Sequence, residues 1–170
     1  MKKIIFATLI SGAMSASALA VDMGSGTVTF TGSIITAPCS IAPGEEIQNI
    51  PLGQVSNVTL EQGNMSSPED FSIKLQGCNL QDNNDVIITF EGTDAGTDTG
   101  LLQITGDAKG AAVKIMNSSG TQIKINAPYD QKYVKGDNEL KFSAALQGLE
   151  GATVVPGDFS ATTRFTLKYE

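Results

Sequence analysis

The chain has 170 residues, of which 41% are hydrophobic and 17% charged, and this length and composition fit one globular domain with a sizeable core. Its net charge of −7 disfavours binding to nucleic acid or to an anionic membrane surface. The absence of histidine removes the usual general base, the usual zinc ligand and every Ser-His-Asp or Cys-His arrangement. We therefore expect no catalytic residues, no metal and no cofactor.

The first twenty residues are typical of a signal peptide. A basic start, Met1-Lys2-Lys3, precedes an apolar run that ends in Ala18-Leu19-Ala20, the form that signal peptidase cleaves. The run is too short to span a bilayer as a stable helix, and no later segment is apolar enough to do so. We expect residues 1–20 to be removed and the remaining chain to be exported, without insertion into a membrane.

The segment before the first cysteine has an unusual strand pattern. A glycine-rich lead, Asp22-Met23-Gly24-Ser25-Gly26, runs directly into alternating residues. A strand with such a lead and an internal glycine would pair weakly within its own sheet. The segment is therefore either a frayed edge strand or a strand intended for another molecule. The residues that share one face are Gly26, Val28, Phe30, Gly32 and Ile34.

Export determines how the two cysteines are interpreted. Cys39 and Cys78 are the only cysteines, and an even number in an exported chain indicates a disulfide. A catalytic thiol is the alternative, which is disfavoured because no histidine can generate the thiolate. We expect a structural Cys39–Cys78 bond, which on the chain-entropy model contributes roughly 4 kcal/mol for a loop of this size.

Alternation of apolar and polar residues, the pattern of half-buried strands, recurs to the end of the chain. Glycine, asparagine, aspartate and proline interrupt it at 92–100, 117–120, 136–138 and 148–157. Short strands at this spacing favour an antiparallel sandwich of immunoglobulin type, with at most one or two short helical turns. After the first set, the alternating residues are Phe71, Ile73 and Leu75; Val86, Ile88 and Phe90; Val113 and Ile115; Ile123 and Ile125; Leu140, Phe142, Ala144 and Leu146; and Ala161, Thr163, Phe165, Leu167 and Tyr169.

The last ten residues are unusual because their alternation continues to the final residue, although domain ends are usually frayed. An apolar strand with no successor would expose a hydrophobic seam and a row of unpaired backbone groups. Proteins normally suppress this hazard at sheet edges. The two ends of the chain therefore suggest complementarity, in which one chain has an extra strand where another has a vacancy.

Four features in order resemble the structural subunits of chaperone–usher pili (fimbriae), especially the major shaft pilins of type 1-like pili. Each fragment alone is weak, but the ordered set together with a signal peptide is specific. The features are residues 26–35 leading to Ala37-Pro38-Cys39-Ser40-Ile41; Ile50-Pro51-Leu52-Gly53-Gln54-Val55; the second cysteine after residues 71–77; and the closing residues 161–169, in which tyrosine is the next-to-last residue of the chain.

The resemblance implies an all-β fold, an incomplete immunoglobulin-like antiparallel β-sandwich that lacks its C-terminal strand and is completed in trans by a donor strand. It implies a signal peptide at 1–20, an N-terminal donor-strand extension at 21–36 and a single pilin domain at 37–170. The donor residues would be Gly26, Val28, Phe30, Gly32 and Ile34. The residues beside the acceptor groove or in contact with the chaperone would be Phe165, Leu167, Tyr169 and Glu170.

The resemblance also implies the partners and the destination. A periplasmic chaperone would lend a strand and hold the carboxylate of Glu170 with basic residues. At the outer-membrane usher, the extension of the neighbouring subunit would replace that strand, so that a head-to-tail homopolymer grows at the cell surface. One departure from the family pattern is Gly26, where many members have a larger apolar group. The outermost pocket is therefore expected to be shallowly filled or empty.

Other interpretations are weaker. Asp94, Asp98 and Asp107 lie in or near a Gly/Thr-rich loop and could indicate calcium, but their spacing does not fit an EF-hand loop. A minor or adaptor subunit remains an alternative, although the long glycine-rich extension favours the shaft. A carbohydrate-binding tip adhesin would need a second domain, and the absence of tryptophan weakens sugar stacking. A secreted hydrolase would need a nucleophile and a base that we do not find.

Overall fold

The computed structural model describes residues 26–80 and 84–170. The expected signal peptide and the start of the glycine-rich lead lie outside the described residues. The chain divides into two units, one ending at Ile35 and the other running from Thr36 to Glu170. In the first unit, residues 26–35 form no helix or strand and are all exposed. The alternating pattern around Val28 and Phe30 therefore does not form a strand in the single chain.

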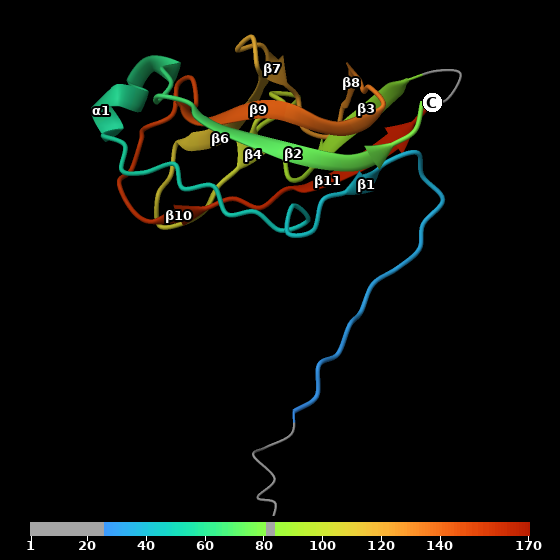
Figure 1. Cartoon of the computed structure of the whole chain (residues 1–170). Coiled ribbons are helices and arrows are strands. Elements are labelled where there is room, and N and C mark those ends of the chain that lie inside the picture. The colour runs from blue at the N-terminus through green and yellow to red at the C-terminus, as the bar shows by residue number, and fades with distance from the viewer. Residues whose placement is uncertain (1–25, 81–83) are drawn as a thin grey trace, which may run out of the picture. The chain divides into compact units, whose positions relative to one another are not determined.

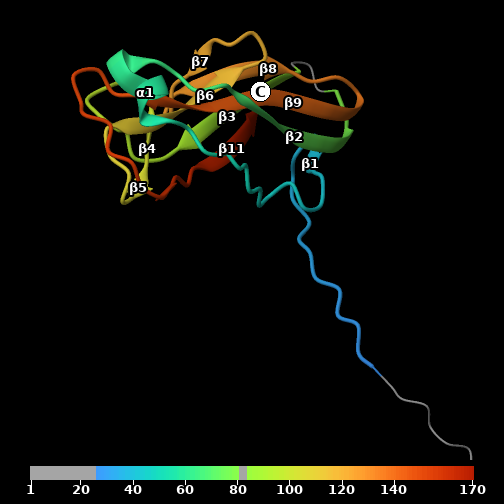
Figure 2. The ribbon, with the colours of Figure 1, turned by 90° about the vertical axis from the view of Figure 1, so that its left-hand side faces the viewer.

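The second unit contains two main antiparallel sheets whose apolar faces pack together (Figures 1 and 2). The larger sheet has the strand order β1-β2-β9-β6-β4, with β7 also paired to β6, and the smaller sheet has the order β11-β3-β8. A separate two-stranded ladder joins β5 and β10. The strands are β1 Ser40–Ile41, β2 Glu69–Cys78, β3 Asp85–Glu91, β4 Leu102–Gln103, β5 Thr105–Gly106, β6 Ala111–Asn117, β7 Gln122–Ile123, β8 Pro128–Lys132, β9 Gly136–Gly148, β10 Phe159–Ser160 and β11 Arg164–Tyr169.

The core forms where the alternating sets of the two sheets meet. Phe71 and Phe142 are cross-strand partners in the larger sheet, and Phe90 of β3 packs against both, with ring centroids 6.2 and 5.3 Å away. Such edge-to-face contacts suit the charge distribution of aromatic rings. The predicted apolar positions of β2, β3, β6 and β9 are buried or partly buried, which confirms those strands.

Within the described residues, the helical content is one short segment at the end of the domain where β9 finishes. Helix α1, Asn57–Leu60, continues into the 3-10 turn η1, Glu61–Gly63. The carbonyl oxygen of Leu60 lies so close to Gly148 that a Cβ there would stand 1.8 Å from it. Only glycine allows the backbone of α1 to approach the end of β9 in this way.

The predicted disulfide is present at the opposite end of the domain. Cys39 and Cys78 are bonded, and their Cα atoms are 4.2 Å apart. The backbone N–H of Asn79 donates to the carbonyl of Pro38 over 2.9 Å. These two links attach the start of the second unit to the end of β2.

Candidate functional site

The last strand, β11, lies at the edge of the smaller sheet, and among the residues that the structure describes it pairs with β3 alone. Glu170 N–H donates to the carbonyl of Asp85 over 3.2 Å, which fixes the phase of the antiparallel ladder. Hydrogen-bonded pairs alternate along such a ladder, so Lys168, Thr166 and Arg164 bond to β3. The backbone groups of the intervening residues point away from β3, toward the open edge.

Those intervening residues are the predicted groove residues Phe165, Leu167 and Tyr169. Their side chains are partly buried and pack against the core, whereas the side chains between them are exposed. The same three residues therefore combine an inward apolar side chain with outward-facing N–H and C=O groups. This combination can bind an added strand through both its backbone and alternate side chains.

Tyr169 is held at the disulfide end of the domain by an aromatic contact. Its ring meets that of the buried Tyr133 edge to face, with centroids 5.7 Å apart. Burial raises the pKa of the Tyr169 phenol, and the neighbouring Tyr133 raises it further. An uncharged phenol suits this half-buried position, and burial disfavours its ionised form.

Glu170, the fourth predicted residue, has a different environment. Its side chain is exposed and forms an ion pair with Lys168. An exposed pair of this kind contributes little to stability because water screens both charges. The strand pairing of β11 therefore does not depend on the Glu170 side chain.

A large groove of about 1020 Å³ opens beside the chain that leads into β11. One wall is residues 49–57, which form no regular strand before α1, and the other is residues 154–161. Its floor contains the buried side chains of Leu60, Ile104 and Val113. An apolar floor between these two walls suits the side chains of an extended apolar segment.

The groove and the predicted residues are neighbours along the chain but do not overlap. Phe165, Leu167 and Tyr169 follow the 154–161 wall along the chain but do not line the groove itself. Sequence reasoning missed both walls as groove residues. The wall at residues 49–57 could have been found from the apolar residues Leu52 and Val55, which pack against the core.

The predicted donor residues belong to the first unit, whereas the groove belongs to the second. Val28 and Phe30 are 75% and 90% exposed, and Ile34 is fully exposed. A Cβ built on Gly26 or Gly32 meets nothing within 4 Å. Apolar side chains this exposed are available to bind another surface.

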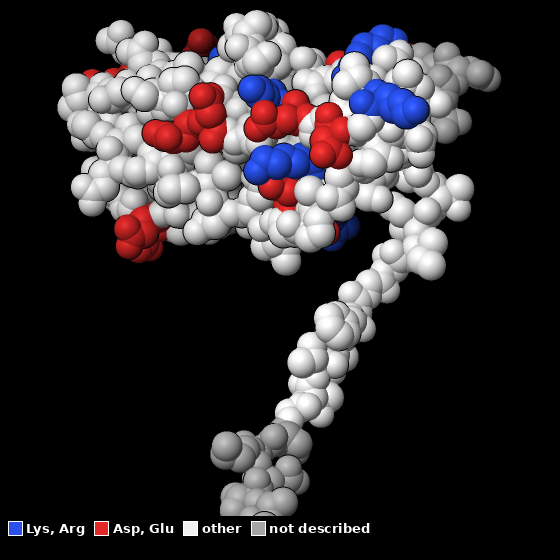
Figure 3. Space-filling view, in the orientation of Figure 1, with Lys and Arg blue, Asp and Glu red and all other residues white. Residues whose placement is uncertain are grey.

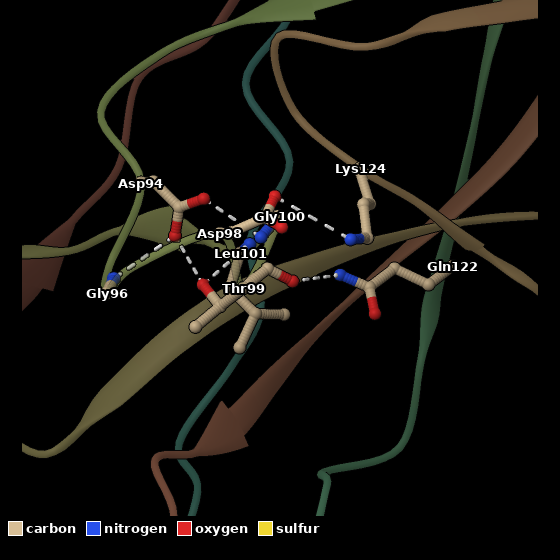
Figure 4. A network of polar contacts seen from close by, with 8 residues as sticks. All are labelled: Asp94, Gly96, Asp98, Thr99, Gly100, Leu101, Gln122 and Lys124. Carbon is tan, nitrogen blue, oxygen red and sulfur yellow. Dashed lines mark hydrogen bonds and ion pairs between the residues drawn. The ribbon is translucent and has the colours of Figure 1, made fainter.

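The acidic loop considered for calcium is held by a network of polar contacts that also includes Gln122 and Lys124 (Figure 4). The Asp94 carboxylate accepts hydrogen bonds from the Thr99 hydroxyl and, at 3.1 and 2.9 Å, from the backbone N–H groups of Gly96 and Gly100. The bond from Thr99 is the main cause of the lowered pKa of Asp94. Asp98 instead lies 3.8 Å from the ammonium of Lys124. Asp94 therefore holds the loop in shape.

Two further features bear on cofactors and membranes. Within residues 26–80 and 84–170, no three His, Cys, Asp or Glu side chains lie close enough together to hold a metal ion. In the same described part of the chain, no helix has the length and apolar character needed to cross a bilayer.

Comparison with known proteins gives consistent matches along the chain. Residues 28–170 match the family described as "Fimbrial protein". The chain is 44% identical to "Fimbria A protein" of Serratia marcescens, covering 100% of this chain and 99% of that protein. It is 46% identical to "Major MR/P fimbria protein" of Proteus mirabilis, covering 92% and 91% of the two chains.

Solved structures give the same result. A subunit of a chaperone–usher pilus, studied for the basis of rod uncoiling, matches with a TM-score of 0.80 and 29% identity over 90% of this chain and all of that one. PapA, the rod subunit of the P pilus, matches with a TM-score of 0.71 and 27% identity over 79% of this chain and all of that one.

Proposed function

The chain belongs to the fimbrial protein family, and on that premise we propose that it builds a pilus shaft by donor-strand exchange. It is a structural subunit of a surface fimbria and has the immunoglobulin-like β-sandwich of its structural relatives. In the proposed exchange, residues 26–34 of one copy form a strand beside β11 of the next. We keep residues 21–36 as the extension and 37–170 as the pilin domain.

The observation that carries this proposal is the open edge of β11. Phe165, Leu167 and Tyr169 turn their backbone donors and acceptors toward that edge, and the groove beside residues 154–161 has an apolar floor. Unpaired strand edges are hazardous in exported proteins, and their cover normally comes from another strand, a loop or a charge. A donor strand satisfies the backbone groups and fills the groove at the same time.

The extension has the side chains that such a groove needs. Val28, Phe30 and Ile34 are apolar and exposed, and full burial contributes about 1.5–3 kcal/mol for each. Their sum is roughly 5–9 kcal/mol before the ordering of a flexible segment is subtracted. Gly32 contributes no such burial, and we assign it to a point of close backbone approach.

The geometry of the exchange produces a filament. Each copy offers two different surfaces, an extension and an open edge, so the contact is heterologous and does not close on itself. The full-length relatives named as fimbrial or major fimbrial proteins favour the shaft over an adaptor position. Because subunit contacts complete the core, we assign the chain a structural role with no catalytic step.

The remaining partners follow from the same open edge. Before assembly, a periplasmic chaperone covers β11 with a strand of its own, and basic residues of that chaperone bind the exposed terminus at Glu170. At the outer-membrane usher, the extension of a second copy replaces the chaperone strand. The match to a chaperone–usher pilus subunit supports this pathway.

The experiment adds a copy of residues 24–36 after Glu170 through a short flexible linker. We expect this self-complemented chain to be a monomer that resists denaturant better than the unmodified chain. The matched control carries Val28→Ser, Phe30→Ser and Ile34→Ser in the added copy and should gain no stability. An unmodified exported chain that is equally monomeric and equally stable would contradict donor-strand exchange.

A further inference from the structure

Apolar side chains are exposed at the disulfide end of the domain, which we define by Cys78 at the end of β2 and Gly136 at the start of β9. Leu80 is 53% exposed and Val134 is 61% exposed. Lys135, beside Val134, is exposed and has no ion-pair partner within the described residues. This end therefore presents two apolar groups and the positive charge of Lys135, with the exposed carboxylate of Asp137, which accepts a hydrogen bond from the Gly77 N–H, two residues further on.

The extension begins at this same end. Cys39 is bonded to Cys78, and Asn79 holds the carbonyl of Pro38 at 2.9 Å. Only residues 35–38 separate Ile34, the last predicted donor residue, from Cys39. Five extended steps along the chain span at most about 17 Å. A bound extension therefore keeps the disulfide end of its own domain close to the place where it leaves its neighbour's groove.

The opposite end of the domain carries α1 and has complementary features. Val58 on α1 is 65% exposed. Glu61 and Glu150 are exposed and have no ion-pair partners within the described residues. Glu150 lies against η1, since its Cγ would be 3.2 Å from a Cβ on Gly63. On the face in Figure 3, acidic side chains lie on the α1 side, acidic and basic ones are mixed in the middle, and mainly basic ones lie toward the other end.

The direction of insertion decides which two ends meet. Strand β11 runs toward the disulfide end, because Tyr169 is paired with Val86 and contacts Tyr133. A parallel donor would leave the groove at that end and bring two disulfide ends together, which favours reciprocal exchange and a closed dimer. An antiparallel donor leaves at the α1 end and allows continued growth.

Resting on the donor-strand function above, we propose that the disulfide end of each subunit docks onto the α1 end of the neighbour that holds its extension. Leu80 and Val134 pack near Val58 of this second copy, and Lys135 faces Glu61 and Glu150. The apolar contacts remove exposed surface from water, and the charges fix the relative orientation of successive domains. The contact thus adds a rigid joint to the flexible strand link.

The test compares filaments assembled from full-length variants in cells. Lys135→Glu alone, or Glu61→Lys with Glu150→Lys, should make purified filaments release subunits in denaturant about two- to fivefold faster at low salt. Combining all three reversals should restore the original rate, because the charges are exchanged across the joint. Lys124→Glu, at an exposed position beside the middle of β6, is the control. It breaks only the exposed pair with Asp98, which water screens, so the rate should stay unchanged.

The same charge reversals are then introduced into the self-complemented monomer, which has no neighbour, and its denaturant midpoint should not change. Two results would overturn the docking contact while donor-strand exchange stands. One is an unchanged release rate in the variants that reverse only one side, and the other is a combined variant whose release rate stays faster than that of the original chain. A self-complemented chain that gains no stability would instead remove the proposed function, and the docking contact with it.

Discussion

The extension and the last strand of this protein have nearly the same alternating pattern and opposite structures. Val28, Phe30 and Ile34 are exposed and unpaired in the first unit, whereas Phe165 and Leu167 lie on an ordered strand against the core. The difference is that β11 has β3 beside it. Alternation therefore determines which face of a strand is apolar, and an available edge determines whether the strand forms.

Removing the disulfide should have the largest effect on stability. It should act on the folded domain that contains β11 and not on the extension. Cys39→Ser with Cys78→Ser opens a loop with a sequence separation of 39. The domain should lose about 4 kcal/mol of unfolding free energy on the chain-entropy model. Guanidinium unfolding of the self-complemented chain measures this loss. A loss below about 1 kcal/mol would mean that the reduced chain already holds its ends together.

Truncating one apolar side chain in each region sharpens the comparison. Phe30→Ala in the added strand should lower the stability of the self-complemented chain by about 3 kcal/mol. The same substitution in the extension of the uncomplemented chain should leave its stability unchanged. Leu167→Ala should destabilise both, because Leu167 already packs against the core. Thr29→Ala is the control on the opposite face of the added strand. An equal effect of Phe30→Ala on the uncomplemented chain would show that the extension already packs on its own domain.

Substitutions of the two glycines of the extension test two different reasons for a glycine. Gly32 is assigned to close approach of the donor backbone, and Gly26 to a pocket that is left unfilled. Gly32→Val in the added strand should destabilise the self-complemented chain by about 2 kcal/mol through overpacking. Gly26→Val should be neutral or stabilising, because the outermost pocket is expected to have room. Both residues have open space around them in the free chain, so neither change should alter the uncomplemented chain. Denaturant midpoints of the four variants measure these effects. A reversed order would mean that the donor strand binds in another register.

The Asp94 loop belongs to neither region and should give the smallest effect. Asp94→Asn should lower domain stability by at most about 1 kcal/mol at neutral pH, because the loop is open to solvent. The folded chain holds the pKa of Asp94 below its ordinary value of 3.8. Its contribution is therefore present above that value and lost as the pH falls through the lowered pKa. Urea unfolding at pH 7 and at low pH should show the difference between the two chains disappearing in acid.

Much of the sandwich could be predicted because long strands repeat their apolar face. The core positions of β2, β3 and β9 and the Cys39–Cys78 bond follow from spacing and export alone. Strand β8 could not be found in this way, because Pro128 begins it and Asp130 and Lys132 lie on its exposed face. The two-residue strands are too short to show any period.

The groove was harder to predict than the strand beside it. Residues 49–57 and 154–161 are distant in the sequence and become its walls only after the domain folds. The buried Tyr133 is followed by Val134 and has the polar residues Gln131 and Lys135 two positions away on either side, so no alternation marks it. Contacts made by tertiary packing leave weaker local signals than the alternation of a long strand.

The disulfide also determines how tension would travel along an assembled fimbria. A pull on the bound extension passes through Pro38 to Cys39 and from there, by a covalent bond, to Cys78 at the end of the ten-residue strand β2. The neighbouring strand β1 has only two residues and could be peeled away by a modest load. The disulfide bypasses that short ladder, so in the proposed exchange the strength of the fimbria would be limited by the donor strand in its groove rather than by the attachment of the extension to its own domain.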